Sequence, residues 1–83
     1  MNIIIRKPLK EFVEKMELKL QANDHKSGWS NCENTYLFSR MKQELIELER
    51  ALINGNKEEI SKEAADIANF AMMISDNNLR QKR

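Results

Sequence analysis

The sequence predicts an all-α protein built from an antiparallel helical hairpin and one further helix. Apolar residues recur at spacings of three and four along most of the 83-residue chain, which is the period of a helix. Only two glycines and one proline occur, and they fall where helices are expected to begin or end. The chain has no alternating apolar and polar pattern of the kind typical of strands, and no internal repeat.

The first helix is expected to begin at Pro8, because proline suits the first turn of a helix. It should fade around Asn23–Asp24. Its apolar residues follow the helical period: Leu9, Phe12, Val13, Met16 and Leu20. Residues 24–33 are polar and contain Gly28, which predicts a loop.

The second helix is expected to follow this loop, with Asn34 or Thr35 as its N-cap. Its inward stripe is predicted to comprise Leu37, Met41, Leu45, Leu48 and Leu52.

The third helix is expected to restart after a turn at residues 54–56. Asn56 and Glu59 resemble an N-terminal capping box, and Asn77–Asn78 mark the expected end. Its inward residues are predicted to be Ile60, Ala64, Ile67, Ala71 and Ile74.

Composition indicates a single small domain, residues 1–83, with a core over about 8–77 and a basic tail over 78–83. The 14 basic and 13 acidic side chains give a formal net charge of +1, so no overall field favours nucleic acid. A lone Cys32 excludes an internal disulfide and favours a reducing compartment. The apolar run at residues 3–5 is too short to span a membrane. We therefore expect a cytoplasmic protein with no nucleic-acid or membrane partner.

Four acidic residues form two short pairs on the predicted hairpin. Glu44 and Glu47 lie three residues apart, as do Glu63 and Asp66, so each pair projects from one side of its helix. Neighbouring helices would bring the four carboxylates together, and a hard divalent cation would neutralise them. Oxygen-only ligation favours Mg²⁺, with Mn²⁺ as a possible substitute. Glu63 shares its flank with Phe70, where desolvation would penalise an unpaired carboxylate.

The acidic pairs also allow interpretations other than a metal site. Acidic residues beside an apolar stripe often form only a solvated face. Glu-x-x-His units, as found in di-iron bundles, are missing from the sequence, and its single histidine and single cysteine do not make a zinc site. There is also no glycine-rich phosphate loop.

The acidic pairs and their surroundings resemble the MazG-like, all-α nucleoside triphosphate pyrophosphohydrolases. The resemblance rests on Glu44-x-x-Glu47, fifteen intervening residues and Glu63-x-x-Asp66, followed by the continuation EAADIANF. The loop His25–Trp29 is similar to a loop that precedes this hairpin in phage and bacterial members. The resemblance covers residues 9 to 76.

The resemblance implies Mg²⁺-dependent hydrolysis of a nucleoside triphosphate, often a deoxynucleotide, to the monophosphate and pyrophosphate. The residues that would hold Mg²⁺ are Glu44, Glu47, Glu63 and Asp66. Glu47 is the predicted general base for the attacking water.

Four further residues are predicted to contact the substrate or a water bound to the metal. Asn69 could hold a metal-bound water or a phosphate oxygen, and Lys26 could meet phosphate as a point charge. Trp29 could stack on a base or plug the loop, two readings that stay open. Arg40 could contact phosphate, although an ion pair with Glu44 four residues on is the plainer account.

Only a short polar, basic tail follows Asp76, so we expect the fourth helix of longer family members to be missing or rudimentary. We therefore expect self-association to a dimer or tetramer that completes a four-helix-type bundle. Two non-enzymatic alternatives remain: a helical interaction module, and a nucleotide-binding sensor without turnover.

Overall fold

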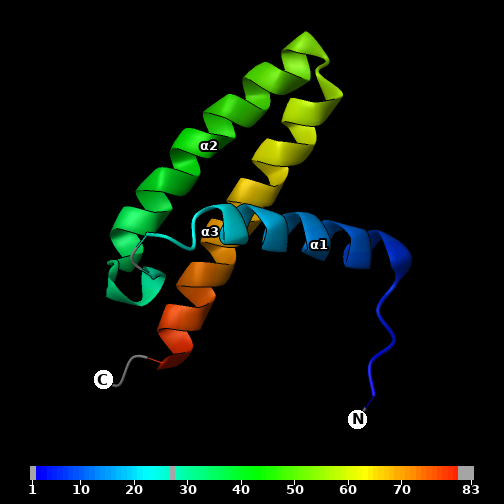
Figure 1. Cartoon of the computed structure of the whole chain (residues 1–83). Coiled ribbons are helices and arrows are strands. Elements are labelled where there is room, and N and C mark those ends of the chain that lie inside the picture. The colour runs from blue at the N-terminus through cyan, green and yellow to red at the C-terminus, as the bar shows by residue number, and fades with distance from the viewer. Residues whose placement is uncertain (1, 27, 81–83) are drawn as a thin grey trace.

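The computed structural model describes residues 2–26 and 28–80, which form three α-helices and one short 3-10 turn (Figure 1). The elements are α1 (Lys7–Ala22), η1 (Trp29–Asn31), α2 (Asn34–Asn54) and α3 (Lys57–Arg80). Among these described residues there is no strand. The all-α prediction is confirmed. None of the helices in this part of the chain combines the length and apolar composition that crossing a bilayer requires.

Helices α2 and α3 form the predicted antiparallel hairpin (Figure 1). Gly55 ends α2 in the left-handed conformation, with φ of 66°, which glycine adopts without steric cost. The amide of Asn56 donates to the Ala51 carbonyl at 3.2 Å, which closes the turn. The Asn56 side-chain oxygen then accepts from the Glu59 amide at 3.1 Å and caps α3. The predicted stop and restart at this turn is confirmed.

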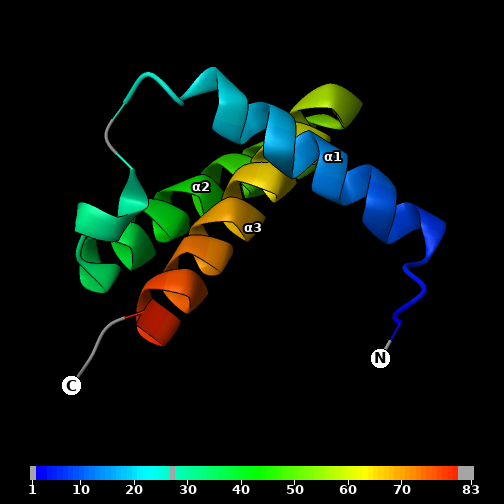
Figure 2. The same ribbon diagram turned by 60° about the horizontal axis from the view of Figure 1, so that its bottom comes forward.

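Helix α1 crosses α3 rather than running parallel to the hairpin (Figure 2). Two polar contacts fix the crossing. The Asn69 amide nitrogen donates to the Met16 carbonyl at 3.0 Å, and Lys19 forms an ion pair with Asp66. Helix α1 is therefore attached to the middle of α3, close to the acidic residues.

The interior seam of the hairpin differs from the predicted one. Leu37 and Ala51 are the buried residues of α2, while Leu45 and Leu52 are about half exposed. Glu44 lies midway between the two buried residues at seven-residue spacing, so it belongs to the seam that faces α3. The stripe predicted from the sequence is centred one residue away from this seam. The difference arises because α2 carries apolar residues on two faces, and only one of these faces meets α3.

The buried face of α3 also differs from the predicted one. Its buried residues are Ala65, Asn69 and Asn77, whereas Ala71 is exposed. The helix continues through the expected end at residues 77–78 to Arg80. Residues 81–83 of the predicted basic tail lie outside the described residues.

The predicted side-chain cap of α2 is not formed. Glu33 is the N-cap residue and makes no capping bond through its side chain. The Asn34 side-chain oxygen instead accepts from Asn77 at 3.2 Å, so it links α2 to α3.

Candidate metal centre and adjoining pocket

Three of the four predicted acidic ligands come together between α2 and α3. One carboxylate oxygen from each of Glu44, Glu63 and Asp66 lies within 4.8 Å of the other two. Glu63 and Asp66 project from the same side of α3, and Glu44 faces them from the hairpin seam. All three side chains are half-buried. The spacing suits one divalent cation bound by oxygen ligands.

The electrostatics of the group reflect this crowding. The nearby carboxyl of Glu44, with which a proton can be shared, raises the pKa of Glu63 from 4.5 to about 7, and burial adds to the rise. Burial also raises the pKa of Asp66, an effect that the ammonium of Lys19 opposes. A bound cation would favour the ionised form of both groups. Without one, the crowding makes the carboxyl of Glu63 easier to protonate than that of an isolated glutamate.

Two polar atoms at this place have no partner within the described residues. Glu63 Oε1 and Asn69 Oδ1 are both buried without a hydrogen bond. Leaving such an acceptor unpaired costs about 1–3 kcal/mol. An oxygen-coordinated cation with its bound waters would satisfy both atoms, so the residues present fit Mg²⁺.

Glu47 lies outside the group of three. Its side chain is 50% exposed, against 16% for Glu44, and it pairs with Arg50 at 3.5 Å. Glu44 lies on the seam with seven-residue spacing and faces α3, whereas Glu47, three residues later, lies outside that seam and faces solvent. Its roles as metal ligand and general base remain predictions.

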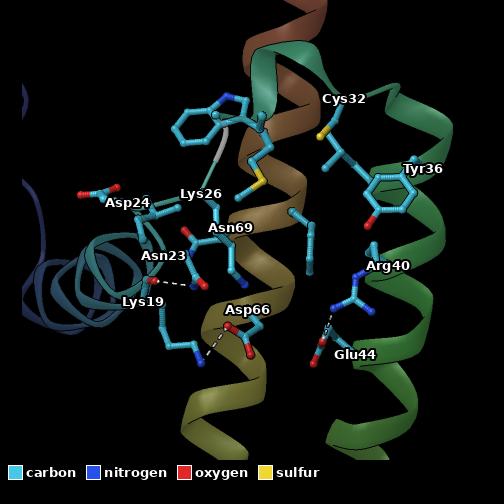
Figure 3. A pocket seen from close by; sticks show the side chains of 16 residues that line it. Lys19, Asn23, Asp24, Lys26, Cys32, Tyr36, Arg40, Glu44, Asp66 and Asn69 are labelled. Carbon is cyan, nitrogen blue, oxygen red and sulfur yellow. Dashed lines mark hydrogen bonds and ion pairs between the residues drawn. The ribbon is translucent and has the colours of Figure 1, made fainter.

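A pocket of about 560 Å³ adjoins the acidic group (Figure 3). Glu44 and Asp66 stand at its wall, with the end of α1, the loop and the first half of α2 around it. Its basic side chains are Lys19, Lys26 and Arg40, and its aromatic side chains are Trp29, Tyr36 and Phe70. Cations and rings around one cavity can hold the phosphates and the base of a nucleotide. The volume falls in the range of small-molecule sites.

Arg40 takes the position that the sequence indicated. It pairs with Glu44 at 3.7 Å, as the plainer account held, and its guanidinium lies 5.8 Å from the centre of the Phe70 ring. Both contacts aim the side chain along the pocket wall (Figure 3). It can therefore hold Glu44 in place and still present donors to a phosphate.

Trp29 serves in part as the structural plug. Its indole N–H donates to Asp76 Oδ2 at 2.9 Å, which ties η1 to the end of α3. The hydrogen bond from the neighbouring Arg80 lowers the pKa of Asp76, and the bond from Trp29 lowers it further. The ring still lines the pocket, so the binding role predicted for it remains possible in geometry.

Asn77 is the central anchor of the loop, and the sequence reasoning missed it. The side chain is 2% exposed, and its amide nitrogen donates to the carbonyls of Trp29 and Cys32 and to the Asn34 side chain. The sequence predicts the end of the helix at this asparagine. The available signal was its spacing of eight residues from Asn69, which puts both amides on one face.

Lys19 and Tyr36 are two further pocket residues that the sequence reasoning missed. Lys19 reads as an ordinary solvated lysine near the end of α1. No local pattern shows that this helix crosses α3 at Asp66.

A family profile described as phosphoribosyl-ATP pyrophosphohydrolase matches residues 9–78. No curated protein and no solved structure matches the chain. The matched family is related to the MazG-like pyrophosphohydrolases as an all-α family, and the resemblance found in the sequence is confirmed at that level.

Proposed function

The chain belongs to the phosphoribosyl-ATP pyrophosphohydrolase family, and from this we propose that it is a Mg²⁺-dependent nucleoside triphosphate pyrophosphohydrolase. The substrate would be a nucleoside triphosphate, often a deoxynucleotide, cleaved between its α and β phosphates. The products would be the monophosphate and pyrophosphate. The observation that carries the proposal is the half-buried group of three carboxylates at the wall of a pocket lined by cations and aromatic rings.

Glu44, Glu63 and Asp66 would hold the cation, with Glu47 as a predicted fourth ligand. When bound, Mg²⁺ supplies neutralisation of charge on the phosphate oxygens and lowers the pKa of a coordinated water. The three carboxylates come from two helices joined by a tight turn, so the protein fixes their spacing before substrate arrives. Such preorganisation reduces the reorganisation that the reaction requires.

Asn69 would act through its unpaired oxygen. The Met16 carbonyl holds the amide nitrogen, so the orientation of the side chain is fixed. A carbonyl oxygen accepts from water and does not bind a deprotonated phosphate oxygen. Of the two roles predicted for Asn69, holding a metal-bound water is therefore better supported.

Lys26 and Arg40 would contact the phosphate chain. Both line the pocket, Lys26 from the loop and Arg40 from α2. Trp29 would offer a ring face to the base. Glu47 would need to turn from Arg50 toward the pocket before it could take the proton of the attacking water.

Self-association is part of the proposal. Leu45, Ile46, Leu52 and Ile53 are about half exposed or more on α2, and few apolar residues of the described chain are fully buried. A second copy covering this face would complete a four-helix-type bundle as a dimer or tetramer. Light scattering after size-exclusion chromatography measures the mass, and a monomer at micromolar concentration would contradict this part.

The activity test is a panel of nucleoside triphosphates, with phosphoribosyl-ATP included, assayed for released pyrophosphate with and without Mg²⁺. We expect release from at least one nucleotide, only with the metal, and its loss in Asp66→Asn. Glu49→Gln is the matched control, because it removes an exposed carboxylate from α2 outside the acidic group. Tight binding of a triphosphate analogue with no release from any nucleotide would favour the sensor instead.

A further inference from the structure

Lys19 forms the one ion pair of the described residues that joins two different helices. Its Nζ lies 3.3 Å from Asp66 Oδ1, and the two side chains are 29% and 22% exposed. The other ion pairs in the described residues join residues three or four apart on one helix. Pairs of that local kind form readily on any helix surface. The Lys19 contact instead depends on how α1 crosses α3.

The ammonium of Lys19 occupies a position where it competes with a divalent cation. Asp66 Oδ1 contacts Lys19, and Asp66 also belongs to the group of three carboxylates. A second positive charge at the same carboxylate would be repelled by the first. Lys19 thus serves as an internal counter-ion for Asp66 when no metal is bound.

Lys19 is also positioned to contact a phosphate chain bound in the pocket. The side chain lines the same pocket as Arg40 and Lys26, and Figure 3 shows it reaching from the end of α1 toward Asp66. Its flexible four-carbon stem and three rotatable donors suit a change of partner better than the fixed fork of arginine. A phosphate chain in this pocket would present oxygens within the reach of that stem.

We propose that Lys19 exchanges its partner when the site fills. It neutralises Asp66 in the empty protein and transfers its ammonium to a phosphate oxygen when the cation and a polyphosphate bind. No bond is made or broken in this exchange. The nucleotide part rests on the function proposed above, whereas the competition with the cation rests on the ion pair and on the group of three carboxylates.

The proposal predicts opposite effects of one substitution on two ligands. Lys19→Met keeps a similar side-chain length and removes the charge, so the metal should bind the nucleotide-free protein roughly five-fold more tightly. The same variant should bind inorganic pyrophosphate, in the presence of Mg²⁺, roughly five-fold more weakly, because one phosphate contact is lost. Titration calorimetry with Mg²⁺ alone, then with pyrophosphate at saturating Mg²⁺, measures both constants without turnover.

Lys15→Met is the matched control. Lys15 is an exposed lysine one turn earlier on α1 and does not line this pocket. The Lys15→Met substitution removes the same charge without touching Asp66, so the dissociation constants for Mg²⁺ and for pyrophosphate should both stay within about two-fold of the wild type. Lys19→Arg keeps the charge and should restore a Mg²⁺ affinity near that of the wild type.

The outcomes separate the two proposals. If wild-type protein binds Mg²⁺ and Lys19→Met binds it no more tightly, the exchange is overturned and the proposed function stands. If only Lys19→Met binds Mg²⁺, the competition is supported and the metal dependence of the native enzyme is contradicted. If neither protein binds Mg²⁺, both proposals are overturned. Equal pyrophosphate affinity of the two proteins would overturn the transfer to phosphate.

Discussion

Glu63→Gln should make the metal-free protein more stable at pH 8 and change little at pH 5. The carboxyl of Glu63 lies against that of Glu44 in a half-buried site, and its pKa rises from 4.5 to about 7. Between these two values the folded protein binds more protons at Glu63 than the unfolded chain does. The free energy of unfolding therefore falls as pH rises through this window, the reverse of a salt-bridged acid.

The magnitude follows from the pKa. The difference between 4.5 and about 7, at about 1.4 kcal/mol for each tenfold change in proton affinity, gives an upper limit of about 3–4 kcal/mol at pH 8. Screening by water at this half-buried site reduces the expected gain to about 1–2 kcal/mol. For a domain of this size, that gain corresponds to a rise in Tm of roughly 5–10 °C. Glutamine keeps the shape of the side chain, so packing contributes little to the difference.

Thermal unfolding followed by circular dichroism, with a chelator present, measures the effect at pH 5 and pH 8. Glu49→Gln is the control and should show no such dependence on pH. Added Mg²⁺ should raise the Tm of the wild type at pH 8 and leave that of Glu63→Gln nearly unchanged. A variant no more stable than the wild type at pH 8 would refute the reasoning, because it would mean that the carboxylates do not repel one another.

Four further predictions concern single residues. Asn77→Leu should lower the free energy of unfolding by about 2–4 kcal/mol, measured by urea denaturation, because it leaves half-buried carbonyls of the loop without their donor; an unchanged midpoint would contradict its anchoring role. Trp29→Phe should cost about 1 kcal/mol in the same assay, since only the indole bond to Asp76 is lost, and no loss would show that the bond does not hold η1. Gly55→Ala should cost about 1 kcal/mol, because its φ of 66° strains any residue with a Cβ; a neutral effect would mean that the turn relaxes. Glu47→Gln should reduce pyrophosphate release roughly 100-fold or more with an unchanged Tm, and full activity would move the general base elsewhere.

Much of the fold followed from local patterns. The break at residues 54–56 could be predicted because Gly55 and the Asn56 cap act within a few residues of one another. The paired acids could be placed on one flank of each helix for the same reason, since spacing alone decides it. Glu44, Glu63 and Asp66 did come together.

What could not be predicted depended on contacts between distant segments. Helical spacing alone does not show which of two apolar faces of α2 meets α3, so it could not predict that Glu44 lies in the seam and Glu47 outside it. The crossing of α1 over α3 was equally hidden, and with it the pairing of Lys19 with Asp66. The role of Asn77 required knowing where the loop returns.

The position of Glu44 between Leu37 and Ala51 has a consequence for the life of the protein in a cell. If the proposed cation binds there, it stabilises the packing of α2 against α3 around a charged residue, so the stability of the hairpin would depend on the cation concentration. Newly made copies would then be most vulnerable to proteases during metal scarcity, and their abundance would follow the supply of magnesium. A residue proposed to hold the metal would then also set how long each molecule survives.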